Sequence, residues 1–164
     1  MCTNIPSNNT YYLTSFCDAS VACGYFSGNC YEYYSADYKR FGCNTLISCC
    51  QGTKCVNLKV IDGGPSCAVE QSAGGPVVDA SYSTCQFFTG STSCGYSDHI
   101  QVVCKPHNGS TIHDTNDPMS NIYDPLDPSG KLPLGPCTYD EEYAADTGLP
   151  ICGPDGHLWN VPAE

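Results

Sequence analysis

Two aspartates stand where short apolar segments end, and they are the first candidates for chemistry in this chain. Asp62 follows the alternating segment 56–61, and Asp79 follows Val77 and Val78. A carboxyl group beside apolar neighbours loses solvation on folding, which raises its pKa and favours the protonated form that a general acid needs. A second interpretation is that Asp79 N-caps a following helix, because Asp is a favoured N-cap residue. Both interpretations stay open at this point.

A third polar group precedes the apolar segment 100–104, where Asp98 and His99 are neighbours. Asp98 is a candidate for a second carboxylate that would act together with Asp79, and the alternative is an aspartate that closes a turn. A Ser-His-Asp triad built from Ser97, Asp98 and His99 is excluded, because neighbours on a strand point to opposite faces.

The sequence gives no ligand pattern for a metal ion, so we expect neither a metal nor a cofactor. The cysteines include a vicinal pair but no paired C-x-x-C motifs, and the four histidines lack tight ligand spacing. A group of aspartates in the C-terminal part lacks the order of a calcium loop and is interrupted by prolines. This group consists of Asp114, Asp117, Asp124 and Asp127.

The elements that must position these carboxylates are short strands and turns. Alternation over 56–61 predicts a strand with one buried face, and Gly63-Gly64-Pro65 predicts a turn after it. A loop over 66–75, a short strand over 76–78 and a helical segment over 80–88 are expected next. Further strands are predicted over 10–16 and 100–104, with one turn of helix over 35–41.

The pair of aspartate segments resembles the signature of double-psi β-barrels. VIDGGP (60–65) followed by VVDASYSTCQFF (77–88) is similar to the two strand ends found in expansins, barwin-like proteins, rare lipoprotein A lytic transglycosylases and family 45 endoglucanases. The resemblance covers residues 9–105. It implies a mainly β fold: a six-stranded double-psi β-barrel, rich in disulfides, with short helices and an irregular acidic C-terminal extension.

The resemblance also implies roles for particular residues. Asp79 matches the catalytic aspartate of the family and would be the general acid, while Asp62 would bind substrate or tune Asp79. The expected groove residues are Thr10, Tyr12, Thr14, Asp18 and Tyr82. Tyrosines are also frequent in the segment 21–55, where two interpretations remain open: packing between disulfides, or the floor of a glycan groove.

The catalytic base of the family has no direct counterpart here. Family 45 enzymes carry an aspartate in the first strand that acts as the catalytic base. At the matching position this chain has Thr14, with Asp18 four residues later. Three options follow: Asp18 or Asp98 supplies the base, the substrate supplies its own nucleophile, or the protein only loosens glycan contacts.

The amino-acid composition predicts the compartment in which this chemistry would occur. Fourteen cysteines in 164 residues predict a disulfide framework and a secreted, extracellular protein, and no apolar segment has transmembrane length. We expect a mature form without its signal peptide. A barrel domain over 1–105 and a Pro/Asp-rich tail over 106–164, with Cys137 and Cys152 as a disulfide, are the predicted parts.

A net charge of −11 disfavours nucleic acids and anionic membranes as partners, and we expect a monomer that binds a cell-wall polysaccharide. The predicted function is a glycan-cleaving enzyme for a β-1,4-linked wall polymer, with peptidoglycan as the first choice, as for a muramidase or lytic transglycosylase. The alternatives are a β-1,4-glucanase of family 45 type and a non-catalytic wall-binding or inhibitory module.

Overall fold

The computed structural model describes residues 4–18, 20–24, 26–106, 134–150 and 152, and it is mainly β. The strands are β1 (Thr10–Ser15), β2 (Tyr34–Ala36), β3 (Leu46–Gln51), β4 (Lys54–Asp62), β5 (Val77–Ala80), β6 (Gln101–Pro106) and β7 (Gly135–Thr138). The helices are α1 (Tyr38–Phe41), α2 (Cys67–Ala73), α3 (Tyr82–Thr89), the 3₁₀ segment η1 (Tyr96–Asp98) and α4 (Glu141–Thr147). Within the described residues, no helix has the length and apolar character needed to cross a membrane.

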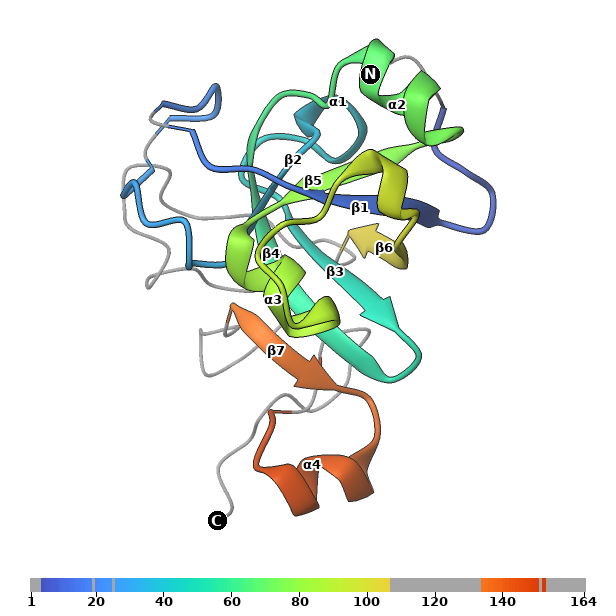
Figure 1. The fold of residues 1–164 in the computed structure, drawn as a ribbon. Helices are drawn as coiled ribbons and strands as arrows, with labels where there is room; N and C mark the ends of the chain where they lie inside the picture. The colour runs from blue at the N-terminus through green and yellow to red at the C-terminus, as the bar shows by residue number, and fades with distance from the viewer. Residues whose placement is uncertain (1–3, 19, 25, 107–133, 151, 153–164) are drawn as a thin grey trace.

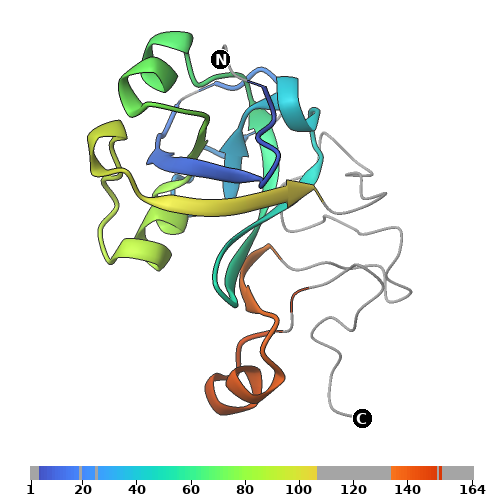
Figure 2. The ribbon, with the colours of Figure 1, turned by 90° about the vertical axis from the view of Figure 1, so that its right-hand side faces the viewer.

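Six strands close into a barrel (Figures 1 and 2). They follow the order β2-β5-β1-β6-β3-β4, and β4 pairs again with β2. The pairs β1–β5 and β2–β4 are parallel, and the other neighbours in the ring are antiparallel. The closed six-stranded barrel predicted from the sequence is confirmed, and membership of the double-psi superfamily stays a prediction.

Alternation along the strands separates a filled interior from an outer face. Tyr11 and Leu13 of β1 and Val78 and Ala80 of β5 belong to one buried apolar cluster inside the barrel. Since successive side chains of a strand point to opposite faces, Thr14 and Asp79 project from the outer face. The first strand is confirmed, and its even-numbered residues face the surface where chemistry can occur.

Disulfides join most parts of the described chain. The bonds are Cys17–Cys30, Cys23–Cys43, Cys49–Cys104, Cys50–Cys55, Cys85–Cys94 and Cys137–Cys152. Cys67 is disulfide-bonded as well, and none of the described cysteines is free. The predicted disulfide framework is confirmed for these residues.

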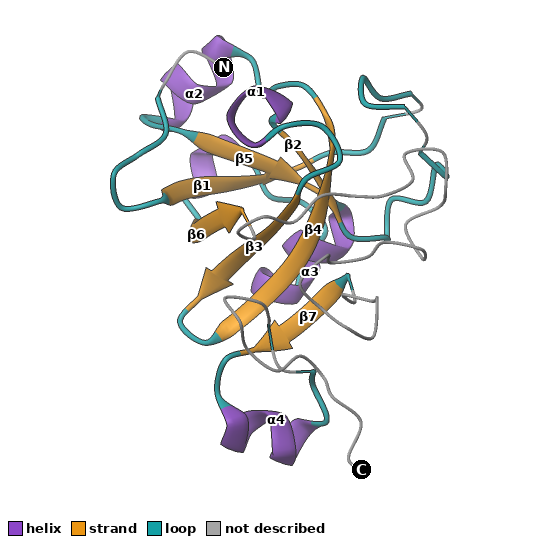
Figure 3. Cartoon of the chain, turned by 180° about the vertical axis from the view of Figure 1, so that it is seen from behind, coloured by secondary structure: helices purple, strands orange, loops and turns teal. Residues whose placement is uncertain are grey.

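Two segments are more regular than their sequences suggest. The expected loop over 66–75 contains α2, because the Ser66 side chain accepts a hydrogen bond from the Val69 N–H and Gly74 ends the helix with φ of 91°. In the expected irregular tail, β7 pairs antiparallel with β4 and α4 follows with Asp140 as its N-cap. Figure 3 shows α4 beyond one end of the barrel and α2 beyond the other.

Four aspartates of the tail lie outside the described residues: Asp114, Asp117, Asp124 and Asp127.

Candidate active site

Asp79 and Thr14 lie side by side on the outer face of the barrel. Parallel pairing of β1 with β5 places Thr14 opposite Asp79, and the Thr14 hydroxyl donates a hydrogen bond to Asp79 Oδ1 over 2.8 Å. Burial raises the pKa of Asp79 from 3.8 to about 6. The Thr14 hydrogen bond opposes this rise in pKa, while the charges of Asp18 and Asp62 add to it. With a pKa of about 6, Asp79 keeps its proton to a higher pH than an ordinary aspartate does, which suits acid–base chemistry.

The N-cap interpretation of Asp79 is wrong. Helix α3 begins at Tyr82, and Ser81 is its N-cap, with the Ser81 side chain accepting a hydrogen bond from the Thr84 N–H. The helix begins two residues later than expected, so its capping requirement is met by a serine. The carboxyl group of Asp79 is left to another role.

A pocket of about 260 Å³ opens beside the Asp79 carboxyl group. Its lining residues come from β1, β5, the start of α2 and the segment that leads into η1: Thr14, Ser15, Pro65, Ser66, Val69, Asp79, Cys94, Gly95 and Tyr96. None of these side chains is cationic. The Ser15 hydroxyl donates to the Thr92 carbonyl and accepts from the Cys94 N–H, which fixes the loop wall of the pocket to β1.

Asp62 lies at the end of β4, close enough for its charge to act on Asp79. Its Oδ1 accepts hydrogen bonds from the backbone N–H groups of Gly63 (2.8 Å) and Ala22 (3.0 Å). Strand β2 separates the two carboxyl groups, because it pairs with both β4 and β5. Two strand spacings place the Asp62 and Asp79 Cα atoms about 10 Å apart.

The other two candidate carboxylates are exposed. Asp98 Oδ2 accepts a hydrogen bond from the Gly95 N–H over 2.8 Å, which agrees with the turn interpretation of this residue. Asp98 thereby holds the turn that carries the pocket residue Tyr96. Asp18 follows β1 and raises the pKa of Asp79 through its charge. The structure therefore gathers Asp79, Asp62 and Asp18, and places Asp98 at the rim.

The expected groove residues spread over a larger area. Thr14 lines the pocket, and Tyr12 shares its face of β1, with its ring packed edge-on against His99 at 5.2 Å. Thr10 begins β1, four residues from Thr14 and therefore about 13 Å away. Tyr82 is the first residue of α3, and its ring packs edge-on against the ring of Tyr31.

The tyrosines of the segment 21–55 divide between the two interpretations. Tyr34 is fully buried, and Tyr33 and Tyr38 pack against the barrel core, as the packing interpretation predicts. Tyr31 is 56% exposed and belongs to neither of the two apolar clusters that contain these three tyrosines.

A buried ion network next to β5 was missed by the sequence interpretation. The Arg40 guanidinium contacts Asp37 at 2.6 Å and Glu70 at 2.7 Å, and these side chains are almost completely buried. Glu70 Oε2 also accepts from the Val77 N–H (3.0 Å), and Arg40 donates to the Val77 carbonyl (3.4 Å). The network therefore holds the first residue of β5, the strand that carries Asp79. One signal was available, because Arg40 is the only arginine in the chain.

The comparisons with known proteins concern the barrel and the segment after it. The family model of Lysozyme A (AlyA) matches residues 1–118. Lysozyme A of Dictyostelium discoideum is 44% identical over 104 residues, which is 63% of this chain and 58% of the relative. Lysozyme B and Lysozyme C of the same organism are each 43% identical, over 104 and 106 residues, with the same coverage.

The chain spans less than two thirds of the length of these three relatives. Lysozyme D of Dictyostelium discoideum is 28% identical over 210 residues, which is 74% of this chain and 80% of the relative. No solved structure matches. Since the family model covers more than half of the sequence, the chain belongs to the Lysozyme A (AlyA) family.

Proposed function

We propose that this protein cleaves the glycan strand of bacterial peptidoglycan with Asp79 as the general acid. The observation that carries the proposal is a partly buried carboxyl group with a pKa of about 6 that lines an outer-face pocket. The lysozyme names of its relatives support peptidoglycan as the substrate. The disulfide framework supports action outside the cell.

The proposed step is protonation of the leaving glycosidic oxygen. Thr14 donates to Oδ1 of Asp79, so Oδ2 is the oxygen that carries the acidic proton. The proton moves from Oδ2 to the glycosidic oxygen while the bond from that oxygen to the anomeric carbon breaks. The electron pair of that bond leaves with the oxygen, and positive charge develops on the sugar ring. Asp79 becomes a carboxylate, whose negative charge then faces this positive charge.

A second group must capture the anomeric carbon. Asp62 is held in place by two backbone N–H groups, and Asp18 is exposed; both lie close enough to influence Asp79. We propose that one of these carboxylates activates a water molecule, which would give products with ordinary reducing ends. Anhydro products would instead show that a hydroxyl group of the substrate is the nucleophile. Asp98 is less suited, because its carboxylate closes the turn at Gly95.

The test is product analysis by mass spectrometry after incubation with purified peptidoglycan. We expect Asp79→Asn to lower the rate of muropeptide release by about 10²–10⁴-fold, the usual contribution of general acid catalysis. Asp146→Asn on α4 is the matched control and should leave the rate unchanged. Lysis that persists at the wild-type rate in Asp79→Asn would overturn the assignment.

Two other functions are distinguished by adding a soluble β-1,4-glucan in parallel. Thr14 stands where family 45 endoglucanases carry the aspartate that acts as catalytic base, and this difference favours a non-catalytic module. Cello-oligosaccharides from the glucan alone would indicate a glucanase. Binding without soluble products from either polymer would indicate a wall-binding module.

A further inference from the structure

Tyr31 and Tyr82 form an aromatic pair at the surface. Their ring centroids are 6.0 Å apart, with an interplanar angle of 73°, and Tyr31 is 56% exposed. The Tyr82 N–H donates to the Cys30 carbonyl over 3.1 Å, and the Cys17–Cys30 disulfide anchors the same loop. The Tyr31 ring is therefore exposed and is also held in position before any ligand binds.

This aromatic pair lies on the same side of the barrel as the Asp79 carboxyl group. Tyr82 follows Asp79 by three residues, at the start of α3. The hydroxyl of the buried Tyr34 donates a hydrogen bond to the Phe16 carbonyl over 2.8 Å. Burial raises the pKa of Tyr34 above its usual range, and electrostatic interactions with Tyr82 and Asp79 raise this pKa further. Tyr82 and Asp79 therefore both lie close enough to act on the Tyr34 hydroxyl.

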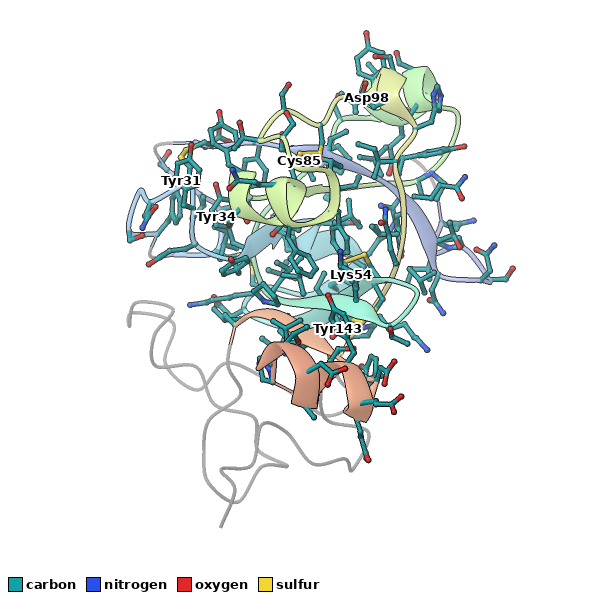
Figure 4. All side chains as sticks on the ribbon, turned by 60° about the horizontal axis from the view of Figure 1, so that its bottom comes forward. Tyr31, Tyr34, Lys54, Cys85, Asp98 and Tyr143 are labelled. Carbon is teal, nitrogen blue, oxygen red and sulfur yellow. A yellow bond between two sulfur atoms is a disulfide. The ribbon has the colours of Figure 1, made fainter. Side chains whose placement is uncertain are left out.

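A third tyrosine borders the pocket on its other side. Tyr96 lines the pocket and is 47% exposed. Figure 4 shows Tyr31 at one side of this face and Asp98, which belongs to the same short helix as Tyr96, at the other, with Cys85 of α3 between them. Cys85 of α3 is disulfide-bonded to Cys94, which lines the acid pocket, the pocket that contains Asp79. The acid pocket thus has the exposed Tyr96 ring in its wall and the exposed Tyr31 ring at the start of α3, as expected if a polymer crosses it.

The charges around the aromatic pair restrict the sugar that it can accept. Glu32 follows Tyr31 in the chain, and its carbonyl accepts a hydrogen bond from the hydroxyl of Ser83, the residue after Tyr82, so this acidic residue lies beside the pair. Among the described residues, the charge of Glu32 is not balanced by an ion pair. A sugar with its own carboxylate, such as N-acetylmuramic acid, would be repelled, whereas N-acetylglucosamine is neutral. The apolar face of a pyranose ring can pack on an exposed tyrosine ring.

We propose that Tyr31 and Tyr82 form a binding subsite for an N-acetylglucosamine unit, beyond the acid pocket on the side away from Tyr96. This inference rests on the proposed function, because it takes the occupant to be the glycan strand that crosses the pocket. Alternation of the two sugars in peptidoglycan puts N-acetylglucosamine next to N-acetylmuramic acid. The subsite thereby fixes which sugar lies at Asp79.

The test measures binding of chitotetraose by calorimetry in the Asp79→Asn background. We expect the additional substitution Tyr31→Ala to weaken binding roughly tenfold, through loss of ring stacking. Tyr31→Leu should weaken it as well, since it keeps an apolar side chain without a ring, whereas Tyr31→Phe should keep the affinity. Tyr143→Ala, an exposed tyrosine on α4, is the matched control and should have no effect.

Equal affinities of the Tyr31→Ala, Tyr31→Leu and Tyr143→Ala proteins would overturn the subsite, as would the absence of chitotetraose binding to the parent protein. Failure of the proposed function has a different signature, because it appears as lysis that does not depend on Asp79. The binding measurement does not need an active enzyme. Unchanged thermal midpoints of the Tyr31 variants show that the loop stays folded.

Discussion

The acidic residues next to β5 are of two kinds. Asp37 and Glu70 share the buried guanidinium of Arg40, and Glu70 also accepts the Val77 N–H. For Asp79, among the described residues, the only side-chain donor is the Thr14 hydroxyl, and no cation pairs with it. Burial raises the pKa of both Asp37 and Asp79, so burial alone does not distinguish them.

The difference lies in what offsets the burial. Arg40 supplies an opposite charge to Asp37 and Glu70. Strand β2 is only three residues long and ends before it reaches Val77 of β5, so Arg40 and Glu70 bind the backbone C=O and N–H of Val77 in its place. This network belongs to the scaffold. Asp79 has a neutral partner, so ionising it costs folding free energy. A carboxyl group kept in that state beside a pocket is a functional candidate, whereas a paired one is usually structural.

The largest effect on stability should come from breaking the scaffold network. Arg40→Met leaves two buried carboxylates without their cation and should lower the free energy of unfolding by about 3–5 kcal/mol. Unfolding in guanidinium chloride measures this value. The control is the triple variant Asp37→Asn, Arg40→Met, Glu70→Gln, which removes all three charges and should recover part of the loss. A loss below about 1 kcal/mol in Arg40→Met would show that the network is not structural.

The pH dependence of stability should show that ionisation of Asp79 destabilises the folded protein. Its pKa is raised in the folded protein, so the folded state binds this proton more tightly than the unfolded state does. Its contribution to stability is therefore greatest below pH 3.8 and is lost as the pH rises to about 6.

Asp79→Asn should thus be more stable than wild type by about 1–3 kcal/mol at pH 7.5, with a smaller difference at pH 4. The measurement is the free energy of unfolding of both proteins at the two pH values. A difference that does not change with pH would contradict the raised pKa. Asp146→Asn again serves as the exposed control.

The smallest effect is expected at Thr14. The Thr14 hydrogen bond lowers the pKa of Asp79, so the nearly isosteric Thr14→Val should raise that pKa further. The alkaline limb of the pH profile of kcat/KM should move upward by about one pH unit, because a hydrogen bond to a charged group contributes about 1.5–3 kcal/mol. Thr14→Ser keeps the hydroxyl and should keep the wild-type profile. An unshifted limb in Thr14→Val would mean that the hydrogen bond does not tune the acid.

The strand ends that carry Asp62 and Asp79 were predictable because alternation and the Gly-Gly-Pro turn are local signals. The partner of Asp79 was not predicted, since Thr14 lies 65 residues away and meets it through parallel pairing. The network was missed for the same reason, because Glu70 is 30 residues from Arg40. Tyr96 had no periodic pattern to reveal it, because it reaches the pocket from the three-residue 3₁₀ segment η1.

Strand β7 has a further consequence for how molecules of this protein meet one another. One edge of β4 pairs with β2, but only from Lys59 onward. Strand β7 pairs with the earlier part of the same edge, residues 54–57. An uncovered edge of this kind offers unpaired N–H and C=O groups to a neighbouring chain and promotes aggregation. The family match ends at residue 118, before β7 begins. The matched region alone would therefore leave residues 54–57 of β4 as a template open to intermolecular pairing, and β7 occupies that template within the same chain.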